Sequence, residues 1–387
     1  MAREDAEGPR PARLTLDQLS IVDLRNLHQV ALEPASGINV ITGHNGQGKT
    51  SILEAIYLLA TTRSFRTSRL SEVPRHGQRI GSVRASLTEH GRFSTSREQS
   101  VGLDRGRRTV RLDGEAPTSL THYATRSPVV VFDPSQMSLS TGPSSERRTL
   151  LDRLTLFTHP AVATHRARYG RALKERQRLL SDGPDQHRAE LDAYETLLAE
   201  HGAAITAVRE QATEALAVTL LAAFHRIAAP NLVLAASYAP GGSADPEIAR
   251  RELRAGRDRD ARSKRCGFGP HRDDLELSLD GHPARVVASQ GQHRAITLAL
   301  KVAEQETIGG ARGVMPILLL DDVSSELDPE RTAALFDHLA STESQIFLTT
   351  TRQDLILTPR RSAGERRDWR VVEGVLSEAR SGLSSGS

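Results

Sequence analysis

The segment Gly43-His44-Asn45-Gly46-Gln47-Gly48-Lys49-Thr50 is the most informative part of this sequence. It fits the pattern G-x-x-x-x-G-K-[ST], the phosphate-binding loop or Walker A motif. Residues 38–41, Ile-Asn-Val-Ile, precede the loop and indicate a short buried strand, and residues 51–60 after it carry apolar side chains at helical spacing. Strand, glycine-rich loop and helix are the context that the motif requires. The sequence therefore predicts an α/β core that binds a nucleotide.

The motif gives its residues distinct tasks. Successive backbone N–H groups of a glycine-rich loop point at phosphate oxygens, and the start of the following helix adds its positive dipole end. Lys49 is expected to reach the β- and γ-phosphates and to act in catalysis, and the hydroxyl of Thr50 is expected to bind Mg²⁺. The expected cofactors are therefore ATP and Mg²⁺. The residues expected to contact ATP in this stretch are Gly43, His44, Asn45, Gly46, Gln47, Gly48, Lys49, Thr50 and Ser51.

Composition narrows the class of protein. The 387 residues are 38% hydrophobic and 26% charged, which is ordinary for a soluble protein, and they contain no apolar run long enough for a membrane span and no signal-peptide pattern. The single cysteine, Cys266, cannot form an intramolecular disulfide, so we expect a reducing, cytoplasmic location and no membrane partner. The net charge is +3 and aromatic residues are 4% of the chain. Nucleic-acid binding, if present, would depend on phosphate contacts rather than on base stacking.

A second apolar strand pattern, residues 317–320, ends in two carboxylates, Asp321 and Asp322. This is a Walker B pattern, in which Asp321 is expected to hold Mg²⁺ and Asp322 to orient the attacking water as a general base. Aspartate is shorter than the glutamate usual at the second position, so slow hydrolysis is expected. Thr350 follows the last apolar strand, at the place where ABC-type ATPases often carry a histidine that contacts the γ-phosphate.

Two further segments resemble motifs of ABC-type ATPases. Ser289-Gln290-Gly291-Gln292 lies before an apolar helix expected over 295–304 and resembles the signature motif. The segment 324–328 resembles the D-loop that runs along a dimer interface. In that family the signature serine of one subunit completes the nucleotide site of another, which implies a catalytic role for Ser289, nucleotide contact for Gln292 and an ATP-dependent homodimer. The residues implied at the dimer interface are Ser289, Gln290, Gly291, Ser325 and Asp328.

The character of the chain changes twice along its length. Alternating strand patterns occupy the first part, helical patterns run from about 136 to 229 with helices expected over 144–157, 160–180 and 186–227, and strand patterns return afterwards. We expect an ATPase head in two parts, residues 1–135 with Walker A and residues 230–376 with the signature, Walker B and D-loop. A helical arm domain over 136–229 separates them, and a flexible tail covers 377–387.

The chain resembles the RecF family of SMC-like ABC ATPases over nearly its whole length. The segments that carry the resemblance include 24–26, 43–50, 53–56, 63–66, Gly269-Pro270-His271-Arg272-Asp273-Asp274, 289–292 and 320–328. The Gly-Pro-His-Arg-Asp-Asp and Ser-Gln-Gly-Gln elements are far more specific than the phosphate loop. Departures from the usual family residues occur at Leu24, Ser135 and Tyr194, none of them at a phosphate-binding position.

The resemblance implies a fold and a role. The fold is α/β, an SMC-like ABC-type ATPase head (a P-loop NTPase of two lobes) with the inserted helical arm. The role is ATP-dependent dimerisation on double-stranded, gapped or single-to-double-strand junction DNA in recombinational repair and replication, with RecO and RecR as partners that help load RecA. Weak, DNA-stimulated ATP hydrolysis would then act as a release switch. Candidate DNA contacts are Arg66, Arg69 and Arg272.

Several interpretations stay open at this level. The basic segment 61–69 is either a solvated loop or an edge that contacts phosphates, and the charged segment 250–264 is either a polar linker or a binding element. Gln136 is the nearest candidate for the glutamine loop of ABC ATPases. The competing classes are a transporter ATPase subunit, an SMC-like nuclease, a structural SMC protein, or an SMC-like ATPase of a different DNA-processing or transport complex. The long helical insertion, the missing nuclease domain and the short arm argue against the first three.

Overall fold

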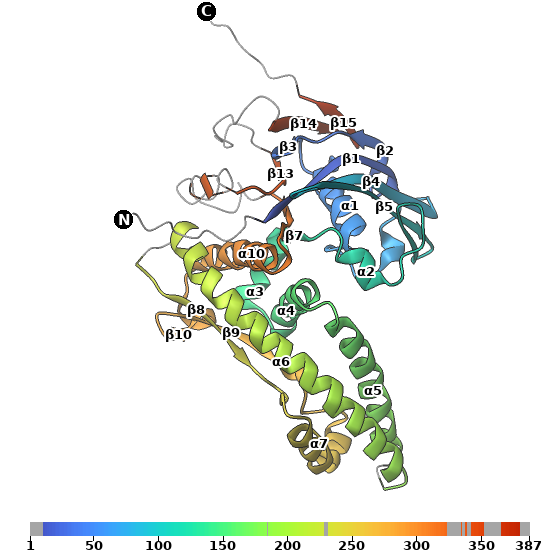
Figure 1. Cartoon of the computed structure of the whole chain (residues 1–387), viewed down its shortest axis with the longest axis vertical. Helices are drawn as coiled ribbons and strands as arrows, with labels where there is room; N and C mark the ends of the chain where they lie inside the picture. The colour runs from blue at the N-terminus through green and yellow to red at the C-terminus, as the bar shows by residue number, and fades with distance from the viewer. Residues whose placement is uncertain are drawn as a thin grey trace, which may run out of the picture. The chain divides into compact units, whose positions relative to one another are not determined.

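The computed structural model describes residues 11–183, 185–227, 231–322, 334, 337–338, 342–351 and 365–379. The chain divides into two compact units (Figure 1). Unit 1 comprises residues 1–136, 226–228 and 298–387, and unit 2 comprises residues 137–225 and 229–297. The D-loop segment, with Ser325 and Asp328, lies outside the described residues. In the part of the chain that the structure describes, no helix combines the length and the apolar character of a membrane span.

Unit 1 is built around two β-sheets. One is mainly antiparallel and has the strand order β11 (Val314–Met315), β1 (Ala12–Leu24), β4 (Ile80–His90), β5 (Ser94–Asp104) and β6 (Arg107–Leu112), with β2 (Leu27–Leu32) also paired to β1. The other has the order β15 (Val375–Glu378), β14 (Arg366–Val372), β3 (Ile38–Thr42), β13 (Ile346–Thr350), β12 (Ile317–Leu320) and β7 (Val129–Phe132). Strand β15 extends to Glu378, two residues into the segment expected to be a flexible tail.

The second sheet decides where the functional side chains lie. Strand β3 pairs in parallel with β13 and β14, and β12 pairs in parallel with β13 and β7. Strands β3, β7, β12 and β13 are short and largely buried, as their apolar runs predict. Because the carboxyl ends of parallel strands meet at one edge of a sheet, the segments that follow β3, β7, β12 and β13 come together there.

Helix α1 (Lys49–Thr61) follows the phosphate loop and contacts strands β1, β4 and β5 of the first sheet and β7 and β13 of the second. Its apolar side chains join one core with strands of both sheets, including Ile52, Leu53 and Ile56, which are at most 1% exposed. The helix begins after Gly48, whose φ of 116° favours glycine. A Cβ at this position would also come within 2.9 Å of the Leu27 side chain, so both backbone and space require glycine here.

Unit 2 is mainly helical. Its longer helices are α4 (Ser144–Thr158), α5 (Val162–Asp182), α6 (Arg188–Ile227) and the first turns of α10 (Gln290–Arg312). Helices α5 and α6 lie side by side (Figure 1), and Tyr169, Ala172, Leu198 and Ile205 pack between them. A small antiparallel sheet has the order β10 (His282–Pro283), β9 (Asp274–Leu279) and β8 (Leu234–Ala239). Other short elements among the described residues are η1 (Leu70–Glu72), α2 (Leu120–Ala124), η2 (Pro134–Met137), α3 (Ser138–Thr141), η3 (Pro270–Arg272) and α9 (Ala284–Val287).

The three long helices expected between 136 and 229 are confirmed, with ends shifted by a few residues. The linker interpretation of 250–264 is wrong, because α7 (Pro246–Ala255) and α8 (Arg257–Ser263) occupy it. The Asp245 side chain caps α7 by accepting hydrogen bonds from the N–H groups of residues 247 and 248 at 2.8 and 3.3 Å, and Pro246 opens the helix. The helix expected over 295–304 is also longer, since it starts at Gln290 and runs to Arg312.

Candidate nucleotide-binding site

Lys49 lies at the centre of the phosphate loop. Its Nζ donates to the backbone oxygens of Gly43 and His44 at 2.7 and 3.1 Å, so the side chain folds back across the loop that it serves. Burial lowers the pKa of Lys49, while the nearby charges of Asp322 and Asp321 oppose that shift. The opposite wall of the loop is backbone from β14, since a Cβ at Gly43 would lie 2.5 Å from the carbonyl oxygen of Val371. These contacts fix the shape of the loop and hold the Lys49 ammonium group inside it.

Thr50 joins the two Walker motifs. Its Oγ1 donates to the carboxylate of Asp321, at 3.0 Å from one oxygen and 2.9 Å from the other. Thr349, at the end of β13, donates a second hydroxyl to the same carboxylate at 2.6 Å. Thr50 and Asp321 are 271 positions apart in sequence. They come together because β3 and β12 both pair with β13, so the segments that follow them meet at one edge of the sheet.

Three carboxylates gather at the end of the buried strands. Burial raises the pKa of Asp321, the hydroxyls of Thr349 and Thr50 oppose that shift, and the charges of Asp133 and Asp322 add to it. Asp133 directly follows β7 and is 6% exposed, and its Oδ2 has no hydrogen-bond partner in the described structure. Sequence reasoning gave Asp133 no role. Its place after a buried strand, at the same sheet edge as Asp321, was the signal that could have found it.

These oxygens suit a hard divalent cation. Mg²⁺ binds through one or two protein oxygens, with water and substrate phosphates completing its shell, so it needs no dense protein ligand set. Within the described ranges, no three His, Cys, Asp or Glu side chains are arranged so that together they could hold a metal ion without other ligands. The Thr50 hydroxyl, the buried Asp321 carboxylate and the unpartnered oxygen of Asp133 fit such an ion.

A cavity of about 810 Å³ opens in front of the loop. Its volume is within the range of small-molecule sites, about 300–1,000 Å³. The residues that line it are Arg25, Asn26, Asn45, Gly46, Gly48, Lys49, Thr50, Ser51, Arg66, Ser71, Glu72, Pro74, Arg75, His76, Gly77, Gln78, Asp321 and Asp322. The cationic side chains in this wall suit a polyphosphate. Sequence reasoning gave no role to the wall made by residues 71–78, because the motif says nothing about which distant segment folds over it.

The turn between β1 and β2 holds the loop from the other side. Asn26 donates to the backbone oxygen of Gly46 at 3.0 Å and accepts from the hydroxyl of Ser51 at 2.9 Å. Arg25 makes two hydrogen bonds to the carboxylate of Glu54 on α1, at 2.9 and 2.7 Å, and Glu54 is fully buried. The pair Arg25-Asn26 therefore fixes both the loop and its helix, a role that sequence reasoning did not assign.

The signature segment lies in unit 2, at the start of α10. The Oε1 atom of Gln292 accepts from the N–H of Ser289 at 2.7 Å, and the hydroxyl of Ser289 accepts from the N–H of Gln292 at 3.3 Å. This reciprocal pair is a capping box, which confirms a helix start at the signature. In unit 1, Thr350 is fully buried at the end of β13. Gln136 lies in η2, just after Asp133.

The three candidate DNA contacts have different surroundings. Arg66 lines the nucleotide cavity and lies 3.3 Å from the buried Glu54 carboxylate. Arg69 is 79% exposed and faces Glu72 at 3.6 Å. Arg272 belongs to unit 2 and donates from Nε to the backbone oxygen of Cys266 at 3.0 Å. The other charged residues of its motif are structural, because Asp273 is buried against Arg209 at 2.7 Å and Asp274 binds Arg147 at 2.7 Å.

A phosphate loop on a parallel sheet, with its threonine on the carboxylate of a Walker B strand, defines the class of protein as a P-loop ATPase head. The family model described as "RecF/RecN/SMC N terminal domain" matches residues 15–364. The chain belongs to the RecF family of DNA replication and repair proteins. The DNA replication and repair protein RecF of Myxococcus xanthus is 38% identical over 366 residues, which cover 92% of this chain and 95% of that protein. RecF of Anaeromyxobacter sp. (strain Fw109-5) is 39% identical over 377 residues, covering 94% and 98%.

Solved structures agree with this assignment. The structure of the recombination mediator protein RecF with ATP, in the RecFOR pathway, is 27% identical with a TM-score of 0.84 and covers 97% of this chain and 100% of that chain. The Smc head domain of Pyrococcus furiosus bound to the C-terminal domain of ScpA is similar in fold, with a TM-score of 0.56 at 16% identity, covering 95% and 96%. The expected SMC-like ATPase-head fold is thereby confirmed.

Proposed function

We propose that this chain is an ATP-driven switch of recombinational repair, which binds Mg²⁺ and ATP in unit 1 and changes its affinity for DNA with the nucleotide. The observation that carries the proposal is the contact of the Thr50 hydroxyl with the Asp321 carboxylate, at 3.0 and 2.9 Å. It joins the phosphate loop to the Walker B strand and leaves a cation-binding pair beside Lys49. The cavity in front of this pair has the size and the charge for a nucleoside triphosphate.

Each residue of the site then has a chemical task. Lys49 and the N–H groups of residues 43–51 bind the phosphates, and Thr50 with Asp321 holds the Mg²⁺, which when bound neutralises phosphate charge. Asp322 orients the attacking water as a general base. Its side chain is one methylene shorter than the glutamate usual at this position, which supports slow turnover. A slow ATPase suits a switch, because the bound state persists until hydrolysis releases it.

The second half of the site comes from a second copy of the chain. Ser289, Gln290 and Gly291, at the start of α10, present a serine hydroxyl and a helix N-terminus, both suited to a phosphate. We assign them, with Gln292, to the γ-phosphate of the nucleotide bound to the partner subunit, with Ser325 and Asp328 at the same interface and Thr350 beside the phosphate. Units 1 and 2 would be the two lobes of the head, and α5 with α6 its arm. ATP would then hold the dimer together until it is hydrolysed.

The partners follow from the family. Relatives are named for DNA replication and repair, and one solved relative is described as part of the RecFOR pathway. We assign to this chain double-stranded, gapped or junction DNA as ligand, RecO and RecR as partners, and the cytoplasm as location. DNA contact should depend on phosphates, because the chain carries many arginines and few aromatic residues.

Fluorescence anisotropy with a labelled gapped duplex tests the proposal. The full chain is titrated in Mg²⁺-ATP and then in Mg²⁺-ADP, at two salt concentrations. We expect tighter, salt-sensitive binding in ATP, and we expect Lys49→Ala to remove the difference because it weakens nucleotide binding. Binding that is equal in both nucleotides, or a Lys49→Ala variant that keeps the difference, would refute an ATP-gated DNA switch.

A further inference from the structure

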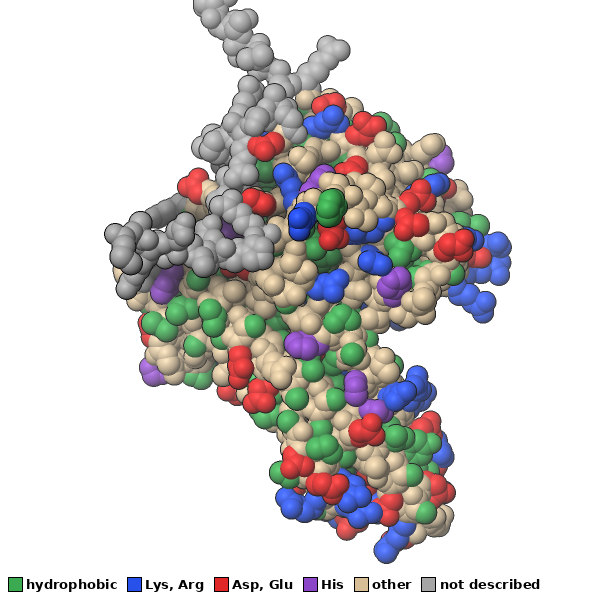
Figure 2. All heavy atoms as spheres, viewed as in Figure 1, with side chains coloured by type: hydrophobic (Ala, Val, Ile, Leu, Met, Phe, Trp, Pro, Cys, Tyr) green, Lys and Arg blue, Asp and Glu red, His purple; other side chains and the backbone are tan. Residues whose placement is uncertain are grey.

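Two segments of unit 1, residues 61–79 and 103–109, contain eight arginines and only two acidic residues, Glu72 and Asp104. Two of the arginines pair with carboxylates outside these segments, Arg66 with Glu54 and Arg75 with Asp23. The other six form a surface that we call the basic face. Its members are Arg63, Arg69, Arg79, Arg105, Arg107 and Arg108. All six are exposed, and Figure 2 shows Lys and Arg side chains gathered at one edge of unit 1.

The fold brings the two segments into contact. The N–H of Arg105 donates to the backbone oxygen of Arg79 at 3.4 Å, and Arg108 donates from Nη1 to the backbone oxygen of Thr62 at 3.2 Å. Burial lowers the pKa of Arg108, and the neighbouring positive charge of Arg63 lowers it further. The arginines of the turn between β5 and β6 therefore lie beside those of the segment that follows α1.

Among the described residues, four of these six arginines have no nearby carboxylate. Arg69 and Arg79 face Glu72 and Asp104 at 3.6 and 3.3 Å, but all four of these side chains are largely exposed, so the pairs contribute little. The remaining four arginines have no carboxylate within 4 Å among the residues that the structure describes. Like charges held together without partners repel one another and destabilise the fold. Binding of a polyanion would neutralise these charges and remove the repulsion between them.

We propose that the basic face binds the phosphate backbone of DNA. Guanidinium groups match phosphate geometry and keep their charge. The only aromatic residue of the two segments, Phe65, packs edge-on against Tyr57 with ring centroids 5.5 Å apart, so it does not present a ring for stacking on a base. Contacts from this face are therefore to phosphates and independent of sequence. The assignment rests on the proposed function and names the surface that performs its DNA-binding part.

The same surface borders the nucleotide cavity. Ser71 and Glu72, in η1, line the cavity. Gly106 lies in the β5–β6 turn, between Arg105 and Arg107 of the basic face. A Cβ at Gly106 would lie 3.3 Å from the side chain of Ser71, so this turn packs against η1. The backbone oxygen of Glu72 also accepts from Arg25 at 2.7 Å. The β5–β6 turn of the basic face and the nucleotide cavity thus share one neighbouring element, η1.

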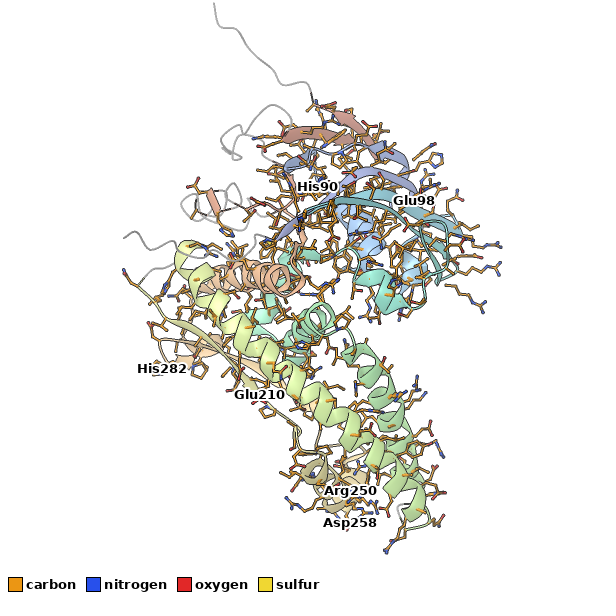
Figure 3. The ribbon with its side chains drawn as sticks, viewed as in Figure 1. His90, Glu98, Glu210, Arg250, Asp258 and His282 are labelled. Carbon is orange, nitrogen blue, oxygen red and sulfur yellow. The ribbon has the colours of Figure 1, made fainter. Side chains whose placement is uncertain are left out.

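The test compares variants that lose equal charge. Arg63→Ala/Arg107→Ala removes two members of the basic face. The matched control Arg84→Ala/Arg250→Ala removes two exposed arginines that already pair with carboxylates, Glu98 at 2.5 Å and Glu247 at 2.8 Å (Glu98 and Arg250 are labelled in Figure 3). Binding of the full chain to a labelled duplex is measured in ATP from 50 to 200 mM salt. A third variant, Arg63→Lys/Arg107→Lys, keeps the charge.

For the basic-face variant we expect the slope of log K against log salt to fall in magnitude by about 2, since each phosphate contact contributes roughly 0.9. At 0.1 M salt this corresponds to a loss of affinity of about 10- to 60-fold. The control and the lysine variant should stay within about two-fold of the parent protein. ATP affinity should be unchanged in all variants, which shows that unit 1 remains folded.

The outcomes separate the two proposals. A parent protein that binds no DNA in either nucleotide refutes the proposed function itself. A parent protein that binds DNA, with a basic-face variant that keeps the same slope, overturns the surface assignment and leaves the function intact. Polyglutamate serves as a second probe. If Arg63→Ala/Arg107→Ala loses binding to polyglutamate and not to DNA, the face binds an acidic protein segment and the DNA assignment is wrong.

Discussion

The ion pair between Arg25 and Glu54 offers a sharp test of how unit 1 is held together. Glu54 is fully buried on α1, the Arg25 side chain is 20% exposed, and two hydrogen bonds of 2.9 and 2.7 Å join them. Arg25→Ala leaves a buried carboxylate with fewer partners. Removing one member of a buried pair costs about 3–5 kcal/mol.

Two features of the site reduce that cost. Water reaches the partly exposed position of Arg25, and the carboxylate keeps the Ser64 hydroxyl at 2.5 Å and the Arg66 guanidinium at 3.3 Å. We therefore expect Arg25→Ala to lower the free energy of unfolding by about 2–3 kcal/mol, below the full range for a broken buried pair. For a domain of about 150–250 residues this corresponds to a fall in Tm of roughly 4–12 °C.

The chain supplies its own probe for the measurement. Trp369 is the single tryptophan and is 6% exposed in the core of unit 1, so its fluorescence during urea unfolding reports on that unit. The control is the same substitution in a Glu54→Gln background, where no buried charge is left and the cost of Arg25→Ala should fall below about 1 kcal/mol. A loss below about 0.5 kcal/mol, or equal losses in both backgrounds, would refute the reasoning, since 0.5 kcal/mol is typical of neutral surface changes.

Three further predictions address the site. Burial raises the pKa of the Asp321 carboxyl above its value in the unfolded chain. The folded protein is therefore destabilised as pH rises from the unfolded-state pKa through the folded-state pKa, because the buried carboxyl must then become charged. Asp321→Asn should therefore raise the Tm of the nucleotide-free protein at pH 7, with a gain that shrinks in acid. A Tm that falls at pH 7, or a gain independent of pH, contradicts this. Ser289→Arg should bind ATP normally yet fail to dimerise in light scattering, and a dimer formed with ATP would exclude a shared site. Turnover by phosphate release should stay below roughly 10 s⁻¹, the median for enzymes, because Asp322 is short, and a faster rate would remove that explanation.

Local pattern was sufficient wherever one segment determines its own structure. The glycine pattern of 43–50 and the apolar runs around it predicted β3 and α1, and the run 317–320 predicted β12 with Asp321 at its end. The segment 250–264 was harder to interpret, because ten of its fifteen residues are charged. Its helices depend on a cap at Asp245 and on buried contacts such as Asp260 with Arg176 at 2.7 Å.

The parts of the site that the sequence did not predict are those that depend on distant contacts. Asp133 becomes relevant only because β7 pairs with β12. Arg25 acts through Glu54, and residues 71–78 act by folding over the loop. None of these relations leaves a periodic trace in the sequence. These contacts depend on which strands become neighbours in the sheets, and the phosphate-loop motif does not determine that order.

The neighbours of β3 also set the order in which the site can form during synthesis. The phosphate loop leaves the ribosome early, but the strands that flank β3 are β13 and β14, which span residues 346–350 and 366–372. Gly374 then packs its backbone against the turn at Asn26, where a Cβ would come within 2.3 Å of the carbonyl oxygen. A nascent chain therefore carries its most recognisable motif for over 300 residues without the walls that give the motif its shape. The phosphate loop therefore acquires its flanking strands only after residues 346–372 have been synthesised, so a chain that stops before them lacks the walls of its own nucleotide site.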